Sequence, residues 1–279
     1  MIENFYYSSP LFQGTCLLYL LAFLGYVSSL FFTHKFLSKN IHLLFYSAFI
    51  CCTLLIVGRW IAAGRPPFKT LYESLIFAGW TVSLVHVFLS IRLKIPLLCV
   101  LSNLGVLFIF GYALSQRDVE IIALPPALQT WLFIPHVISY FLAYGALFIA
   151  GISALLYFFY PNGIKTSPRL GKQQLVDLSS VTYSVTKFGF LLLTLGLLLG
   201  AWWGQMAWSN YWGWDPKENW ALVSWLIFAT YLHARNLKFI TKKQLSWFVV
   251  IGVLAIVFTY LGMSYLPTAN DSLHVYTES

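Results

Sequence analysis

The chain carries the stretch WWGQMAWSNYWGWDPKENWALVSW at residues 202–225. Seven of its eleven tryptophans lie in this stretch, beside Asp215, Lys217 and Glu218. Tryptophan is costly to expose to water and too amphipathic for the centre of a bilayer, so this density favours an aromatic shelf at a membrane surface. Such a shelf suits a large flat ligand.

An ordinary aromatic belt is the alternative interpretation, in which indole rings only anchor helix ends among the lipid headgroups. A belt places one or two tryptophans at each helix end, as Trp60, Trp80 and Trp131 do in this interpretation. Seven in one turn-rich segment exceed that number, so we favour the shelf.

Working outward, the composition predicts an all-α integral membrane protein. Of 279 residues, 59% are hydrophobic and only 9% are charged, too few to cover a soluble globule. The apolar runs are long and do not alternate, which favours helices over barrel strands. Eight runs of spanning length fall near 14–33, 41–63, 71–91, 95–114, 135–160, 182–201, 219–235 and 246–266. We therefore expect about eight transmembrane helices.

These helices are expected to form one polytopic membrane domain over residues 1–279. Residues 202–220 form an external Trp-rich segment between helices six and seven, and 267–279 an external C-terminal tail. In this arrangement one side carries twelve Lys and Arg residues and the other carries five. The positive-inside rule makes the basic side cytoplasmic, or stromal in a plastid, so both termini and the Trp-rich segment lie on the opposite side.

The net charge of +8 arises mostly from short loops between apolar runs, so it indicates topology rather than nucleic-acid binding. The four cysteines, Cys16, Cys51, Cys52 and Cys99, lie in apolar runs and form no C-x-x-C pair. Neither a redox pair nor a zinc site is indicated. Without a C-x-x-C-H motif, the chain is not itself a c-type cytochrome.

The segment WGQMAWSNYWGWDPKENW (203–220) resembles the WWD signature of heme-handling membrane proteins, most closely the CcsA (ResC) subunits of the system II cytochrome c synthase. The stretches LYESLIFAGW (71–80), HVISYFLAY (136–144) and YLHAR (231–235) look like that family too. The resemblance implies heme b as cofactor and export of heme for thioether attachment to apocytochrome c. It implies heme lyase activity only within a complex that includes a CcsB (ResB)-like membrane subunit, with thiol-reducing proteins as further partners. It also implies a bacterial inner membrane or a thylakoid membrane.

Residue by residue, the resemblance assigns an external heme site to His136 and His274. Two imidazoles on opposite faces of a porphyrin would hold its iron, and the aromatic side chains would hold the ring. The expected ring-binding residues are Trp202, Trp203, Trp208, Trp212, Trp214, Asp215 and Trp220. Without the shelf, two interfacial histidines bonded to water would be the better interpretation. His274 departs mildly from the family, which commonly has Gly-Leu-His-Ser-Tyr where this chain has Ser-Leu-His-Val-Tyr.

A second heme site within the membrane is implied at His233, about 20 Å along its helix from Trp220. Its opposite ligand is either His86, which lies at similar depth, or a histidine of the partner subunit, which the family favours. For His233, a structural histidine bonded to a neighbouring helix is the alternative.

The basic residues Arg59, Arg65 and Lys69 are expected to face heme propionates, the apocytochrome or lipid headgroups, with headgroups preferred. For Asp215 we prefer a cap on the seventh helix over direct heme contact. Two other functions remain open. One is a system I-type protein that passes heme to a chaperone, and the other is a non-heme transporter or structural membrane subunit.

Overall fold

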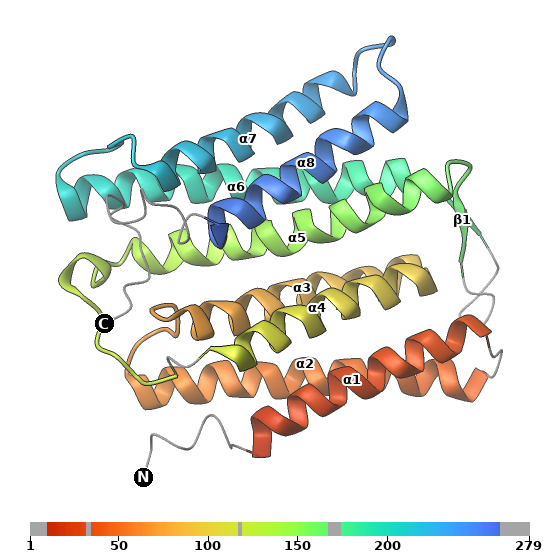
Figure 1. The fold of residues 1–279 in the computed structure, drawn as a ribbon, viewed down its shortest axis with the longest axis horizontal. Helices are drawn as coiled ribbons and strands as arrows, with labels where there is room; N and C mark the ends of the chain where they lie inside the picture. Colours follow the sequence, from red (N-terminus) through yellow and green to blue (C-terminus); the bar gives the residue numbers. More distant parts are fainter. Residues whose placement is uncertain (1–9, 32–34, 117–118, 167–173, 263–279) are drawn as a thin grey trace. The chain divides into compact units, whose positions relative to one another are not determined.

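A computed structural model describes residues 10–31, 35–116, 119–166 and 174–262. Within this part the chain forms eight α-helices, a single turn of 3-10 helix and two short strands (Figure 1). In chain order they are α1 (Pro10–Phe31), α2 (Lys35–Ala63), α3 (Leu71–Leu93), α4 (Pro96–Ser115), η2 (Pro126–Leu128), α5 (Phe133–Phe159), β1 (Ile164–Lys165), β2 (Leu175–Val176), α6 (Leu178–Trp208), α7 (Pro216–Ala234) and α8 (Lys242–Tyr260). The prediction of an all-α protein is confirmed.

The helices group into two compact units, each built from four consecutive helices. In the first unit, α1 packs on α2 and α4, and α3 packs on α4 and α2. Its interior is aromatic: Phe12, Tyr19, Phe45 and Phe110 are fully buried and in ring contact. Residues 163–176, which carry β1 and β2, belong to this unit as well. Whether the whole chain behaves as one domain stays a prediction.

The second unit comprises residues 124–162 and 177 onward. Its longest contact runs between α5 and α6, and α5 also packs on α8, which pairs with α7. Glycines on α6 allow the close approach, because a Cβ at Gly189 would lie 2.7 Å from Leu147 of α5 and one at Gly196 would lie 2.8 Å from Tyr140. The second unit carries the Trp-rich segment.

Seven of the described helices are long and apolar enough to cross a membrane, so the chain is a multi-pass membrane protein. The exception is α7, which opens on polar residues that include Lys217 and Glu218. At 19 residues it is still about 28 Å long, the thickness of a hydrocarbon core. The eighth span that the sequence predicts therefore corresponds to an observed helix of adequate length.

The C-terminal end of α6 differs from expectation. The sixth apolar run was expected to end near residue 201, but α6 continues to Trp208, so the first half of the Trp-rich segment is helical. Trp and Met residues keep this part of the helix apolar, and no Pro interrupts it before Ser209 adopts φ = 59°. The connection between α5 and α6 contains an antiparallel pair of strands, with Ile164 opposite Val176 and Lys165 opposite Leu175.

Candidate functional site

His136 lies in the first turns of α5 and faces α6. Its Nδ1 is 2.9 Å from the backbone oxygen of Gly196. A carbonyl can only accept, so Nδ1 carries the hydrogen and donates it. In the neutral ring the lone pair then lies on Nε2, the arrangement found in histidines that bind metals. The side chain of His136 is thus set in the tautomer that an iron ligand requires.

An indole ring lies beside this imidazole on the side of α6. The ring of Trp203 lies 5.5 Å from that of His136, centroid to centroid, at an angle of 32°. Trp203 is only 3% exposed, donates its Nε1–H to the oxygen of Ala127 at 2.9 Å, and meets Trp208 edge to face. These contacts bury the Trp203 ring and hold it against His136, so Trp203 is not an exposed part of the predicted shelf.

Other tryptophans of the predicted shelf are open. Trp202 is 48% exposed and meets Trp131 of the preceding loop edge to face, and Trp131 is itself 61% exposed. Trp214 is 69% exposed and stands at right angles to Trp212. Trp220, by contrast, packs on Phe258 of α8. The seven indoles therefore divide into packed ones and displayed ones, a division that the sequence does not indicate.

Trp214 is displayed on a tightly bonded turn. Its φ of 57° lies in the left-handed region, which costs a non-glycine residue of this size about 1 kcal/mol or more. The Glu218 carboxylate accepts the N–H groups of Gly213 and Asp215, at 2.8 and 3.2 Å, and the Asn219 amide donates to the oxygen of Trp214 at 2.9 Å. Neighbouring side chains thus stabilise the strained backbone that holds the exposed indole.

Asp215 caps α7, as preferred from the sequence. Its carboxylate accepts the N–H of Lys217 at 2.7 Å, and it forms a capping box with Glu218. Lys217 lies in the first turn of α7, ahead of the expected span. Burial lowers the pKa of its ammonium group to about 8, and the nearby Asp215 carboxylate opposes the shift. The D-P-K-E sequence signalled this cap, whereas nothing in it signalled the lowered pKa of Lys217.

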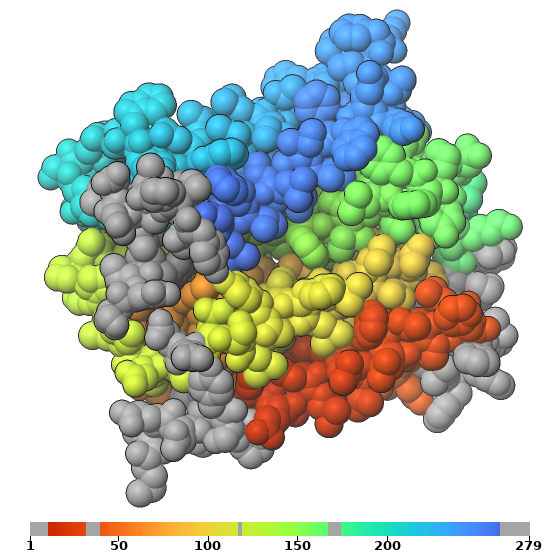
Figure 2. Space-filling view, in the orientation of Figure 1, coloured from red at the N-terminus to blue at the C-terminus, as the bar shows by residue number. Residues whose placement is uncertain are grey.

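His233 is exposed at the far end of α7 from the Trp-rich segment. Its Nδ1 donates to the oxygen of Ala229, one turn back in the same helix, at 2.8 Å. As in His136, the lone pair therefore lies on Nε2. Three other residues of α7 are exposed as well: Val223, Leu226 and Thr230. Together with His233 they are spaced by three, four and three residues, so all four lie on one face of the helix. In Figure 2, α7 and α8, in blue, lie at the surface of the second unit.

His86 is placed differently, because both of its ring nitrogens are used inside the first unit. Nε2 lies 3.2 Å from the hydroxyl of Tyr26, and Nδ1 bonds the hydroxyl of Ser102, which donates in turn to the oxygen of Leu98. The ring also stacks on Phe45, and the residue is 2% exposed. Iron could bind His86 only after one of these bonds had broken.

This chain of hydrogen bonds continues from Tyr26 to His42 Nδ1, at 3.0 Å, and so joins α1, α2, α3 and α4. His86 lies seven residues before the end of α3, and Ser102 lies six residues after the start of α4. His86 is thus about 10 Å from the C-terminus of α3, and Ser102 is about as far from the N-terminus of α4, which follows directly in the chain. The hydrogen bonds therefore run across the unit, roughly perpendicular to the helices, and they link all four helices to one another.

Arg59 and Arg65 are buried, contrary to the expectation that they face propionates, a protein partner or headgroups. Both pair with Glu73, Arg59 through Nε at 2.7 Å and Arg65 through Nη1 at 3.0 Å. They also donate to backbone oxygens of residues 119, 120 and 122. These bonds join the α2–α3 loop to the segment after α4, which the sequence alone could not show.

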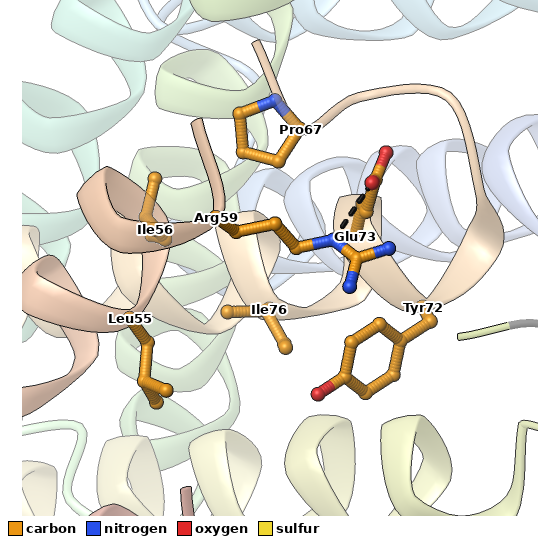
Figure 3. Close-up of a pocket in the computed structure, with 7 residues that line it drawn as sticks. All are labelled: Leu55, Ile56, Arg59, Pro67, Tyr72, Glu73 and Ile76. Atoms are coloured by element: carbon orange, nitrogen blue, oxygen red, sulfur yellow. Dashed lines mark hydrogen bonds and ion pairs between the residues drawn. The ribbon is translucent and has the colours of Figure 1, made fainter. Parts of the chain in front are cut away.

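Beside this cluster lies a hollow of about 280 Å³, lined by Leu55, Ile56, Arg59, Pro67, Tyr72, Glu73 and Ile76 (Figure 3). The guanidinium of Arg59 lies 5.5 Å from the centroid of the Tyr72 ring. Figure 3 shows it held between that ring and the Glu73 carboxylate. The groups that line the hollow are thus already engaged with one another.

His274 lies outside the residues that the structure describes, so its pairing with His136 stays a prediction. The residues that sequence reasoning missed are Gly196, Gly200, Glu218 and Asn219. The spacing of Gly189, Gly196, Gly200 and Gly204 along one apolar run could have indicated close helix packing. It could not have indicated that the packed partner is a histidine.

Comparison with known proteins shows which family the chain resembles. A family model described as "Cytochrome C assembly protein" matches residues 68–269, more than half of the chain. The cytochrome c biogenesis protein CcsA of Guillardia theta is 33% identical over 264 residues, which cover 85% of this chain and 87% of that protein. The CcsA of Nicotiana tomentosiformis is 35% identical over 260 residues, 82% of each chain.

A solved structure, the cytochrome c heme lyase CcmF, matches with a TM-score of 0.69 at 17% identity. The match covers 90% of this chain but only 45% of that one, so this chain spans less than half of its length. At this identity the likeness concerns the fold, and it agrees with the helical architecture described above.

Proposed function

Because this chain belongs to the cytochrome c assembly protein family and acts in cytochrome c biogenesis and heme handling, we propose that it exports heme b and presents it for attachment to apocytochrome c. One observation carries the proposal. His136, beside the indole-rich end of α6, donates Nδ1–H to a backbone oxygen and so directs its lone pair to Nε2. That is the donor chemistry that heme iron takes from histidine.

In the proposed external site, His136 and His274 would hold the heme iron. Trp202 and Trp214 would supply exposed indoles for the porphyrin ring, with Trp212 beside Trp214 and Trp208 beside Trp203. Each ring contact contributes about 1 kcal/mol beyond area burial. Asp215 and Trp220 support the site through the cap and the packing of α7 rather than by touching the ring. By the positive-inside rule, this end of the second unit faces away from the cytoplasm or stroma.

The attachment itself adds a cysteine thiol across a heme vinyl group. Sulfur bonds one vinyl carbon and hydrogen the other, so nothing is released and no electrons are exchanged. Such a step needs orientation more than acid–base chemistry. What this chain supplies is a fixed imidazole, a rigid wall at Trp203 and a displayed indole at Trp214. The C-x-x-C-H peptide of apocytochrome c then replaces one histidine ligand with its own.

For the intramembrane site we propose His233 with a second ligand from a CcsB-like subunit. An imidazole on a lipid-facing helix surface is costly, and its position in the exposed face of α7 indicates a partner helix there. His86 is the weaker candidate, because both of its nitrogens are engaged in the first unit. We assign His86 a structural role.

Heme spectra of purified protein test this proposal. From heme-replete cells, His136→Ala and His233→Ala should each lower bound heme, and added imidazole should restore the six-coordinate spectrum in each. His42→Gln is the matched control, because it removes a half-buried histidine that belongs to neither site. Wild-type heme content in both alanine variants would refute the ligand assignment.

A pull-down separates the two heme functions. Capture of apocytochrome c with an intact C-x-x-C-H motif supports heme attachment, whereas capture of a small heme chaperone instead supports delivery alone. Protein that shows no Soret band after expression with ample heme would point to a non-heme membrane subunit.

A further inference from the structure

The imidazole of His136 lies in a notch on α6 where Gly200 has no Cβ and Gly196 presents its carbonyl oxygen. Gly196 supplies the carbonyl oxygen that accepts Nδ1–H at 2.9 Å. Gly200, one turn later, supplies space: a Cβ built there would lie 2.5 Å from Cε1 and 2.8 Å from Nδ1 of His136. Real Cβ atoms do not approach other atoms this closely, so any side chain at residue 200 would displace the ring.

The two glycines act together for a geometric reason. In an α-helix, Cα–Cβ bonds tilt toward the N-terminus, so the Cβ of residue i+4 stands beside the carbonyl of residue i. Without a Cβ at Gly200, the oxygen of Gly196 is open to a second donor besides its own helical N–H. A carbonyl has two lone pairs and can accept both. Trp203 lies on the same face, seven residues beyond Gly196, and closes the notch.

We propose that Gly196 and Gly200 are positioning residues for the heme iron at His136. They hold the imidazole as the Nδ1–H tautomer and aim Nε2 away from α6, toward the position of the metal. The inference rests on the proposed function, since it assigns a role toward the same iron. It adds that the strength of the iron–histidine bond is set by the backbone of α6.

A hydrogen bond from Nδ1 to a carbonyl makes the imidazole a stronger donor at Nε2, which favours ferric over ferrous iron. Loss of such an outer partner typically lowers metal affinity about 10- to 100-fold. A tenfold loss confined to the ferric state raises the one-electron midpoint potential by about 59 mV. The notch therefore influences both how tightly heme is held and its oxidation state during handover.

The first experiment determines the tautomer of His136 in the wild-type protein. Nitrogen-15 NMR of ¹⁵N-histidine-labelled protein without heme distinguishes the two neutral tautomers, and His136→Ala identifies the signal. We expect the Nδ1–H form at His136. An Nε2–H form would overturn the proposal, because the ring would then present the wrong nitrogen to iron.

The second experiment compares Gly200→Ala with Gly189→Ala. A Cβ at Gly189 would meet Leu147 of α5 at 2.7 Å, so this control introduces similar crowding between the same two helices, about 16 Å away along α6. We expect Gly200→Ala to lower heme affinity at least tenfold and to raise the midpoint potential, with a smaller change in Gly189→Ala. Equal effects in the two variants would reduce Gly200 to a packing residue and overturn the proposal.

Failure of the proposed function gives a different pattern. If His136→Ala keeps all of its heme, the ligand assignment is wrong, whatever tautomer the apoprotein shows. If His136→Ala loses heme while Gly200→Ala matches Gly189→Ala, the ligand is right and only the positioning role fails.

Discussion

Replacing Glu73 with glutamine should destabilise the first unit while leaving the heme chemistry of the second unchanged. The side chain of Glu73 is fully buried and accepts from Arg59 at 2.7 Å and from Arg65 at 3.0 and 3.2 Å. It also accepts the N–H groups of Lys69 and Thr70, at 2.8 and 3.3 Å. Glutamine keeps the shape but removes the charge, and its amide nitrogen must face one of these donors.

Breaking a buried ion pair by removing one partner costs about 3–5 kcal/mol, because a desolvated charge is left without its counterpart. Here two guanidinium groups lose the same carboxylate. For a chain of this size each kcal/mol corresponds to about 2–4 °C of melting temperature, so a loss of 3 kcal/mol lowers Tm by roughly 6–12 °C. Thermal unfolding of the purified protein in detergent, followed by circular dichroism, measures the shift.

Lys242→Gln is the matched control. Lys242 pairs with Asp177 at 3.1 Å, but both side chains are about half exposed, so the pair contributes less than about 1 kcal/mol. If Glu73→Gln melts like the control yet loses heme, the cluster serves ligand binding and the structural role assigned to Arg59 and Arg65 is wrong.

Three further results are expected. Asp215→Ala should lower the stability of α7 by about 1 kcal/mol, and Asp215→Asn should largely restore it, as measured by thermal unfolding. Trp214→Ala should weaken heme binding about fivefold, the equivalent of about 1 kcal/mol, whereas Trp225→Phe, whose ring packs inside the second unit on Phe190, should not. Burial lowers the pKa of Lys217 to about 8 in the folded protein, so between about pH 8 and 10.5 the unfolded state binds more protons than the folded state. The free energy of unfolding should therefore rise with pH in this range. Melting curves measured over a pH series test this, and the same slope in Lys217→Met would contradict it.

The sequence alone was sufficient for the architecture. Spanning helices follow from the length of apolar runs, a local property, and six of the eight predicted spans end within two residues of the observed helices. The cap at Asp215 is also local, since the N-cap residue and Glu218 are three positions apart. The position of the Trp-rich segment between the sixth and seventh helices could be predicted for the same reason.

Only the tertiary structure distinguished the histidines. His86, His136 and His233 all lie in apolar helices, and the sequence does not show their hydrogen-bond partners. In the structure His86 is bonded at both ring nitrogens, whereas His136 and His233 each donate Nδ1–H to a backbone carbonyl and direct Nε2 away from it. The partner of His136 is 60 residues away, and the hydroxyl that bonds His86 Nε2 is equally distant.

Only the tertiary structure also distinguished the buried from the exposed arginine and tryptophan side chains. Arg59 is buried because the chain returns 60 residues later to supply carbonyl oxygens, and Trp203 differs from Trp214 because only the former meets the loop before α5. The local sequence pattern determines where a helix begins and how long it is, and it identifies the chain as a membrane protein. Burial and hydrogen bonding depend on which distant segments meet, and these decided which histidine nitrogens are engaged within the fold and which charges are structural.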